Sequence, residues 1–325
     1  MKRDLILKYA DTSGKGIEVA PYFNPVLTKR AGHDLLIMDV FDTETLRDRV
    51  REDPLIDSAR AAEIEEVDLV GDASRLGDVI EQAGLTGRID YIVSSHNFEH
   101  LPNPILFLRG AGKALAPGGV LSMAVPDCRA SFDHFRMPTR LSDWLAAYHE
   151  DRRQPSPETV FDSAANQSAY MRDGAPTPGC NLAYDTPAGF EPDRNLAAAY
   201  ADYVTTKVAR GDYRDTHCNV FFPESLELML RDLRHLGLIE LEVIEVSPTR
   251  GLEFFVHLRK PRTPQDIPDT AFYARRKELL IAVSHGLGAA GFGLGPVAKL
   301  KRAVTGRLNT WRIQLKHRRR ARKAP

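Results

Sequence analysis

The chain has 325 residues, 43% of them hydrophobic, which is enough to bury a full core and excludes a disordered chain or a small disulfide-stapled scaffold. Its three cysteines, Cys128, Cys180 and Cys218, are odd in number and form no C-x-x-C pair, so neither a disulfide framework nor a metal cluster is predicted. The net charge of zero hides an asymmetry, because every acidic residue lies at or before Glu278 and 11 basic residues follow it. An acid as early as Asp4 is untypical of a secretory signal, so we expect a cytoplasmic protein.

Three apolar segments in the first 70 residues predict parallel strands, each followed by a turn. Charged residues between them, such as 43–51, have the composition of an exposed helix. Open parallel sheets bind ligands at the carboxyl ends of their strands, so these turns contain the first candidate binding residues. The segments are 16–20 with a turn at Pro21, 34–39 ending in Asp39, and 66–70 running into Gly71, Asp72 and Ala73.

Asp39 is the strongest single candidate for binding a nucleoside. It ends the second strand 21 residues after Glu18, where a ribose needs an acceptor for its two hydroxyls. A helix cap is the alternative for Asp39, and a simple strand-ending turn is the alternative for Asp72. The sequence lacks G-x-G-x-x-G at the first turn, which argues against a dinucleotide site and a dehydrogenase.

The segment 90–127 predicts a strand, a helix and a second strand joined by a parallel crossover. The first strand, 91–93, runs into a polar crest of Ser94, Ser95, His96 and Asn97. The helix stops before Pro117-Gly118-Gly119, and the second strand, 120–125, leads to Asp127. The crest and Asp127 are therefore expected at the ligand-binding edge of the sheet.

Three motifs in this segment together resemble the class I S-adenosylmethionine-dependent methyltransferases, in a type 11-like branch. They are S-x-H-x-x-E-H from Ser94 to His100, L-x-P-G-G from Leu115 to Gly119, and V-P-D from Val125 to Asp127. The resemblance implies an α/β fold with a Rossmann-like seven-stranded sheet and S-adenosyl-L-methionine as cofactor. The cofactor-binding residues that it implies are Glu18, Ala20, Pro21, Asp39, Asp72, Ala73 and Ser95.

The first turn departs from the E/D-x-G-x-G pattern typical of this class. Glycines there let the backbone approach the cofactor, whereas this chain has Glu18-Val19-Ala20-Pro21. This turn, followed by Asn24-Pro25, resembles a subgroup that accompanies glycosyltransferases and polysaccharide-forming enzymes, as do P-D-x-R-x-x-F-D from Pro126 and P-S-P-x-x-V-F-D from Pro155. The resemblance points to saccharide substrates by association.

About ninety residues, 128–216, separate the fifth strand from a helix at 223–236 and from strands at 239–246 and 252–258. Long elaborations at a ligand edge are usually lids or binding segments, so we assign this insert to substrate recognition. It is expected to contain helices at 141–149 and 195–210, separated by a Pro/Gly-rich loop at 174–192. The chain then divides into a cofactor-binding part at 1–127, the insert at 128–216, a completing part at 217–262 and a basic extension at 263–325.

Methyl transfer from a sulfonium is an in-line displacement that is catalysed largely by alignment, so no metal is required. A hydroxyl acceptor benefits from a base, and a histidine with a pKa near neutrality is suited to that role. His96, at the end of the fourth strand, and His217, in a D-x-H return from the insert, are equal alternatives, and Asp127 is a third catalytic candidate. Without such roles His96 would orient the cofactor, Asp127 would cap a helix, and His217 would be a buried structural histidine.

The predicted function is O-methylation of a saccharide or related small-molecule hydroxyl acceptor. The alternative is a degenerate cofactor-binding scaffold in a polysaccharide assembly system. Residues 279–298 carry no formal charge and precede all 11 basic residues of the tail, but five glycines and Pro296 oppose insertion. We therefore expect residues 279–325 to lie on an anionic membrane surface, peripheral at its inner face, with a solvated tail as the alternative. No specific nucleic-acid partner is expected.

Overall fold

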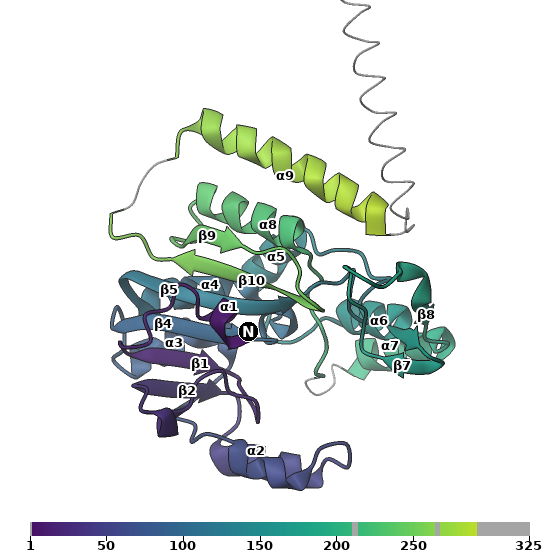
Figure 1. Cartoon of the computed structure of the whole chain (residues 1–325), viewed down its shortest axis with the longest axis horizontal. Helices are drawn as coiled ribbons and strands as arrows, with labels where there is room; N and C mark the ends of the chain where they lie inside the picture. The colour runs from purple at the N-terminus through teal and green to yellow at the C-terminus, as the bar shows by residue number, and fades with distance from the viewer. Residues whose placement is uncertain (1, 210–213, 264–266, 291–325) are drawn as a thin grey trace, which may run out of the picture.

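The computed structural model describes residues 2–209, 214–263 and 267–290, which form an α/β fold around one seven-stranded sheet (Figure 1). The strand order is β3-β2-β1-β4-β5-β10-β9, and β10 runs antiparallel to both of its neighbours. The predicted Rossmann-like sheet of the class I methyltransferases is thereby confirmed. The strands are β1 (Gly16–Val19), β2 (Leu35–Asp39), β3 (Leu69–Val70), β4 (Ile89–Ser95), β5 (Leu115–Pro126), β9 (Glu242–Val246) and β10 (Glu253–Arg259).

Strand β5 begins at Leu115, five residues before the predicted start, because the Pro-Gly-Gly segment belongs to the strand. Gly118 adopts a left-handed backbone with φ of +94°, and a Cβ on Gly119 would lie 3.0 Å from the backbone oxygens of Ile89 and Asp90. Glycine suits the left-handed conformation at position 118 and the close approach of the backbone at position 119. The pairing of β4 with β5 shifts register at this point, so the motif marks an irregularity in the sheet.

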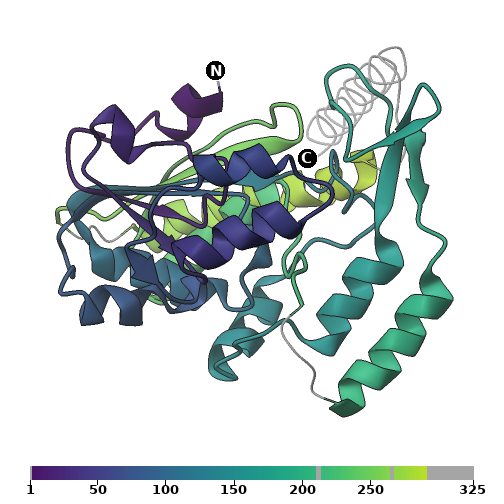
Figure 2. The same ribbon diagram turned by 90° about the horizontal axis from the view of Figure 1, so that it is seen from below.

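Helices α3, α4 and α8 pack into the main core on one face of the sheet (Figure 2). The sides of α4 and α8 that face the strands are built from Leu, Ile, Phe and Met, while charged residues face away. The other face is covered by α1 and the loop around Leu27. The helices of the sheet domain are α1 (Lys2–Ile6), α2 (Thr43–Glu52), α3 (Leu76–Gln82), α4 (Pro104–Ala114) and α8 (Pro223–His235).

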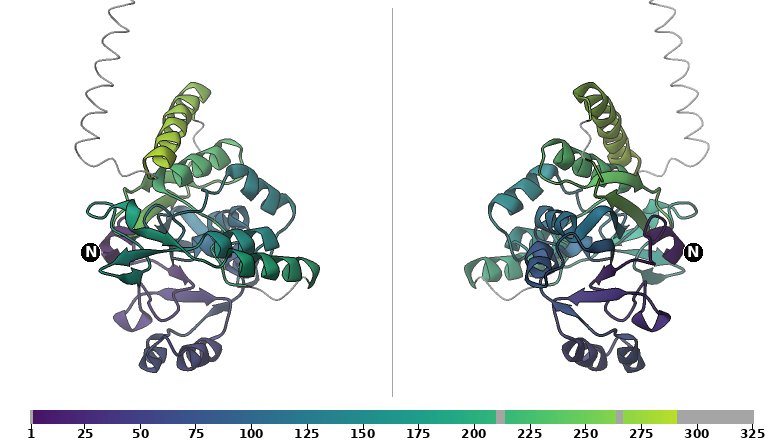
Figure 3. Two further views of the ribbon diagram at one scale, coloured as in Figure 1. Left: turned by 90° about the vertical axis from the view of Figure 1, so that its right-hand side faces the viewer. Right: turned by 90° about the vertical axis from the view of Figure 1, so that its left-hand side faces the viewer.

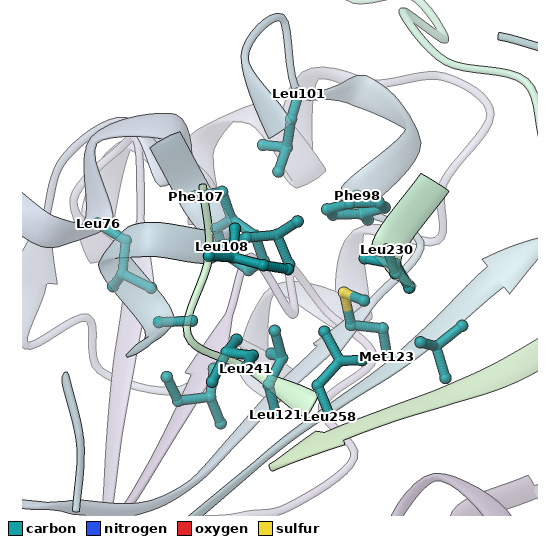
Figure 4. Packing of buried hydrophobic residues seen from close by; sticks show 14 of the residues in the cluster. Leu76, Phe98, Leu101, Phe107, Leu108, Leu121, Met123, Leu230, Leu241 and Leu258 are labelled. Carbon is teal, nitrogen blue, oxygen red and sulfur yellow. The ribbon is translucent and has the colours of Figure 1, made fainter. Parts of the chain in front are cut away.

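Figure 4 shows how side chains from these elements interdigitate in the core. Phe107 and Leu108 of α4 pack against Leu121 of β5 and Leu258 of β10, and all four are fully buried. Truncating one such side chain to alanine removes buried area and leaves a cavity, at a cost of about 2 to 5 kcal/mol. The core therefore holds the ends of β4 and β5 rigidly.

The insert after β5 forms a separate layer beyond the carboxyl ends of the parallel strands (Figure 1). Helices α5 (Leu141–His149) and α7 (Leu196–Ala209) confirm the two predicted helices. The predicted loop at 174–192 is wrong in part, because it contributes two strands to a three-stranded antiparallel sheet. These strands have only three residues each and include prolines, so they carry no readable alternation. The remaining elements are α6 (Pro157–Asn166), β6 (Ser168–Arg172), β7 (Ala175–Thr177) and β8 (Phe190–Pro192).

Helix α9 (Asp269–Ala290), which the sequence did not predict, packs along α8 (Figure 3). Phe272 stacks on His235 with ring centroids 3.7 Å apart, and Leu279 is 2% exposed. Residues 279–290 of the predicted membrane-surface segment thus belong to a helix that is attached to the body, and residues 291–325 lie outside the described part of the chain. Within that part, no helix is long and apolar enough to cross a membrane.

Candidate active site

The carboxyl ends of β1, β2 and β3 bring three of the predicted cofactor-binding residues together. The amide of Ala20 donates to the carbonyl of Met38 at 2.8 Å, and the amide of Gly71 donates to the carbonyl of Asp39 at 2.8 Å. These bonds place the turns after the three strands in one row. Ala20, Asp39 and Asp72 consequently lie along the same edge of the sheet.

Asp39 has the environment expected of a ribose-binding acid. Its side chain ends β2, the residue is 6% exposed, and its Oδ1 accepts the amide of Phe41 at 3.2 Å. Burial raises the pKa of this carboxyl above its usual value, although bonds from the Phe41 and Val40 amides act in the opposite direction. A partly desolvated carboxylate forms strong hydrogen bonds with hydroxyl donors, which suits the two hydroxyls of a ribose.

Glu18 shapes the loop that follows β1. The residue is 1% exposed, and its carboxylate accepts the amides of Val26 at 2.6 Å and Leu27 at 3.0 Å. Burial raises its pKa to about 7 despite these bonds. Glu18 therefore holds the loop after β1, whose first proline, Pro21, is buried, and its role in cofactor binding stays a prediction.

The first turn keeps a glycine-like backbone without glycine. Ala20 and Tyr22 have φ of +50° and +48°, in the left-handed region that a side chain disfavours by about 1 to 2 kcal/mol. Strain of this kind gathers at functional sites, where the surrounding structure maintains it. The residues present thus fit S-adenosylmethionine: the turn follows the path that lets the backbone approach it, with Asp39 alongside.

Asp72 and Ser95 complete the cofactor edge. The Oδ1 of Asp72 accepts the amide of Ser74 at 2.8 Å and so caps the short 3-10 helix η3 (Ala73–Arg75). The alternative proposed for Asp72 was a simple strand-ending turn, and in the structure Asp72 caps the turn that Ala73 begins. Ser95 ends β4 opposite Ala124 of β5, at the same edge.

His96 is paired with two carboxylates in this structure. It has φ of +51°, its Nε2 lies 2.7 Å from Oε2 of Glu253, and its Nδ1 lies 3.5 Å from Oε1 of Glu99. Burial lowers the pKa of the imidazole, but the two carboxylates outweigh it and raise the pKa to about 9. A histidine that is already protonated at neutral pH accepts no further proton, which disfavours His96 as the base.

Asp127 is occupied by structural contacts. It is fully buried, its Oδ1 accepts the amide of Arg129 at 2.9 Å, and its Oδ2 accepts the guanidinium of Arg129 at 2.6 Å. The hydroxyl of Thr249 also donates to Oδ2, at 2.5 Å. With both oxygens bound, Asp127 fixes the start of the insert on the sheet.

His217 forms a buried pair with an aspartate from the other end of the insert. The residue is 8% exposed, and its Nδ1 lies 2.5 Å from Oδ2 of Asp133, whose Oδ1 accepts the guanidinium of Arg136 at 2.8 Å. Burial opposes ionisation of Asp133, but His217 and Arg136 outweigh it and hold its pKa below the usual value. The pairing fixes the ring so that Nε2 faces Glu99 at 4.0 Å.

Two residues that the sequence reading did not select, Glu99 and His100, lie at the centre of this group. Glu99 is 0% exposed, and neither carboxylate oxygen accepts a hydrogen bond from any described residue. His100 Nε2 lies 4.0 Å from Oε1 of Glu99, and its Nδ1 lies 2.8 Å from Asp215. The signal was the E-H of S-x-H-x-x-E-H, but burial of the glutamate could not be read from the motif.

Asn219 holds His217 opposite Glu99. Its amide accepts the indole N–H of Trp144 at 2.7 Å and donates to the carbonyl of Leu101 at 2.8 Å. Its backbone amide donates to the carbonyl of Glu99 at 2.9 Å. The return from the insert is thereby bound directly to the 3-10 turn η4 (Phe98–His100).

Comparisons with known proteins agree with this geometry. A family model described as a methyltransferase domain matches residues 13–233. No match was found among curated proteins.

Several solved structures align over most of the chain at low similarity. An S-adenosylmethionine-dependent methyltransferase from Mesorhizobium loti is 13% identical, with 78% of this chain and 95% of that chain covered and a TM-score of 0.39. A methyltransferase from Aquifex aeolicus is 12% identical, with coverages of 78% and 92% and a TM-score of 0.36. A glycopeptide N-methyltransferase bound to S-adenosyl-L-homocysteine is 13% identical, with coverages of 80% and 88% and a TM-score of 0.36.

The family match spans more than half of the chain and includes the row of turns that fits the cofactor. The strand order, with its one antiparallel strand next to β5, is that of the predicted class. The chain therefore belongs to the methyltransferase-domain family and is a class I S-adenosylmethionine-dependent methyltransferase.

Proposed function

We propose that this enzyme methylates a hydroxyl oxygen of a saccharide or related polar acceptor. The observation that carries the proposal is the group of Glu99, His100 and His217 beside the end of β4, in which Glu99 and His217 are buried and His100 is half-buried. Ionisable side chains are costly to bury, and groups of them at the carboxyl edge of a sheet are candidates for a functional site. Residues near both ends of the insert hold the two histidines of this group. The segment that we assign to acceptor recognition therefore borders the group that we assign to catalysis.

The cofactor, when bound, supplies an electrophilic methyl group on a sulfonium. The acceptor oxygen forms the new C–O bond as the S–C bond breaks, and the S–C electron pair stays on sulfur to give S-adenosylhomocysteine. Asp39 and the Ala20 turn hold the adenosyl and methionine parts, which fixes the methyl carbon relative to the end of β4. The hydroxyl proton is removed at that end of the strand, a step that a thiolate nucleophile, which is already deprotonated, does not need.

Exposed aromatic residues on the insert support a saccharide acceptor. Phe135, Tyr184 and Tyr200 are 44%, 88% and 61% exposed. An aromatic ring offers an apolar face with, in tyrosine, a polar edge, and this combination suits the mixed surface of a sugar. The similarity of the P-S-P-x-x-V-F-D segment to a polysaccharide-associated subgroup points to the same acceptor class.

The test starts with calorimetric binding of S-adenosylhomocysteine and continues with a survey of glycan acceptors, scored by S-adenosylhomocysteine release. We expect turnover on a hydroxyl acceptor and a loss of about 100-fold or more in His217→Ala, with cofactor affinity retained. His149→Ala, which changes an exposed histidine on α5, is the matched control and should retain activity. Turnover on amine or thiol acceptors alone would overturn the proposal, and cofactor binding with no turnover at all would support the scaffold alternative.

A further inference from the structure

The geometry points to a divalent transition-metal site formed by Glu99, His100 and His217. One oxygen of Glu99 and the Nε2 atoms of the two histidines could each serve as a ligand, and such ligand atoms all lie within 4.8 Å of one another. Two imidazoles and a carboxylate suit zinc, iron, manganese or cobalt better than magnesium or calcium.

The separations within the group favour an ion over direct pairing. Glu99 Oε1 lies 4.0 Å from Nε2 of His100 and 4.0 Å from Nε2 of His217, beyond the range of a hydrogen bond. Ligand atoms around a tetrahedral ion at about 2.1 Å lie about 3.4 Å apart, so the side chains need to close by little more than 1 Å. The three groups are too far apart to bond to one another and close enough to bind a common cation.

The carboxylate of Glu99 gives independent support. It is fully buried, and both of its oxygens are without a hydrogen-bond partner among the residues that the structure describes. His96 Nδ1 lies 3.5 Å from Oε1 of Glu99 without a hydrogen bond to it, so the buried carboxylate still lacks a charge in direct contact, which is unfavourable. A metal ion in the gap would satisfy it.

The outer contacts of both histidines are those of metal ligands. His217 Nδ1 is held by Asp133 at 2.5 Å, and His100 Nδ1 is held by Asp215 at 2.8 Å. Metal-binding histidines almost always use the second ring nitrogen in this way, because a carboxylate fixes the ring and strengthens the ligand nitrogen. In both residues the bond leaves Nε2 as the free atom, and both Nε2 atoms face Glu99.

Three protein ligands leave at least one position open to the acceptor. This catalytic part of the inference rests on the proposed function: the acceptor hydroxyl binds the ion through oxygen, its proton leaves to water, and the resulting alkoxide forms the C–O bond. The ion changes neither its charge nor its oxidation state. His217 then serves as a ligand and not as the proton acceptor.

Metal binding is measured on the full-length protein after removal of metals with a chelator. Co²⁺ is titrated while its visible absorption is recorded, and Zn²⁺ is titrated by calorimetry. We expect one equivalent of each to bind, and Zn²⁺ to raise the melting temperature of the stripped protein. Absence of saturable binding would overturn the inference.

Three variants locate the site. Glu99→Gln should lose one-equivalent binding, and Asp215→Asn, which alters an exposed partner of His100 and leaves the buried groups in place, should weaken it about 10- to 100-fold. His149→Gln is the matched control and should bind normally. Binding that is equally strong in Glu99→Gln, Asp215→Asn and the control would assign the metal to another place and overturn the site.

Activity separates this inference from the proposed function. Loss of turnover in the stripped enzyme, restored by Zn²⁺ or Mn²⁺, is the result expected of a catalytic ion. Metal binding without turnover on any hydroxyl acceptor would overturn the proposed function and leave the metal site standing. Full turnover in a stripped enzyme that binds no Co²⁺ would overturn the metal site and leave the function standing.

Discussion

Asp39 offers the most direct test of how single residues bind the cofactor. Replacing it with alanine removes charge-assisted hydrogen bonds to the ribose, each contributing about 1.5 to 3 kcal/mol. We expect the affinity for S-adenosylhomocysteine to fall at least 10-fold, measured by calorimetry. Asp42→Ala, which removes an exposed cap of α2 three residues away, is the control and should bind normally. Equal affinities in the two variants, both folded by circular dichroism, would remove Asp39 from the site.

The buried side chain of His257 leads to a prediction of how the free energy of unfolding depends on pH. The residue is 1% exposed in β10, its Nδ1 lies 2.9 Å from the hydroxyl of Ser122, and the charged groups acting on it are Glu245 and Lys8. Burial lowers its pKa from 6.5 to about 4, so between these values the unfolded chain binds a proton that the folded chain does not. Stability is therefore present above pH 6.5 and is lost as the pH falls towards 4, by about 2 kcal/mol between pH 7 and pH 5.

Urea unfolding at pH 7 and pH 5 checks this value, with His257→Gln as the informative variant. Glutamine keeps a polar group beside Ser122 but has no ionisation, so the difference between the two pH values should shrink by about 2 kcal/mol. His149→Gln should leave the difference unchanged, because that histidine is exposed. An unaltered pH dependence in His257→Gln would show that other groups cause it.

The contact between η4 and the segment that follows the insert holds the site residues in place. Its removal therefore gives a prediction at the scale of secondary-structure elements. Asn219→Ala leaves the buried indole of Trp144 and the carbonyl of Leu101 without their partner, at about 1 to 3 kcal/mol each. Stability in urea should fall, and turnover should fall with it at temperatures where the variant is folded, because His217 is no longer held opposite Glu99. Cofactor affinity should be unchanged. Asn166→Ala, which removes one bond on α6, should show neither effect.

Elements with a strong pattern were predictable, and those fixed by distant contacts were not. Helix α8 has a continuous apolar face and begins at Pro223, so its start was correctly predicted. Helix α9 was missed because it packs through a few residues, among them Phe272 and Leu279, while Leu280 and Ile281 remain exposed. Glu99 was missed as a site residue because its surroundings include residues far away in the sequence, such as Asn219, which binds its carbonyl from 120 residues later in the chain.

At the scale of the whole molecule, charge separates the body from the tail. All 11 basic residues after Glu278 follow α9, whose Leu279 is buried and whose Val283 packs on Phe222. The body up to Glu278 carries an excess of acidic residues. We therefore expect attraction to an anionic surface to come mainly from the segment after Ala290, at about 1 kcal/mol per basic residue near the lipid.

Vesicle sedimentation tests this membrane-surface proposal. The full chain and a version ending at Ala290, which keeps α9 intact, are compared on anionic and neutral vesicles at low and high salt. We expect only the full chain to sediment, on anionic vesicles and at low salt, because Lys and Arg are screened by ions. Equal sedimentation of both proteins, or binding indifferent to lipid charge, would contradict the proposal.

The position of the insert has a consequence for how acceptor preference can change. Asp133 and His217 stand close to its two ends and are tied to the sheet domain through Asp127 and Asn219, so residues 134–216 form a loop whose beginning and end are both fixed. Evolution, or an engineer, can exchange most of that stretch as a cassette, provided that Asp215, Arg136 and Trp144, which support His100, Asp133 and Asn219, are kept. Grafting 134–216 from a relative with these three residues retained should transfer the relative's acceptor preference while the affinity for S-adenosylhomocysteine stays that of the recipient.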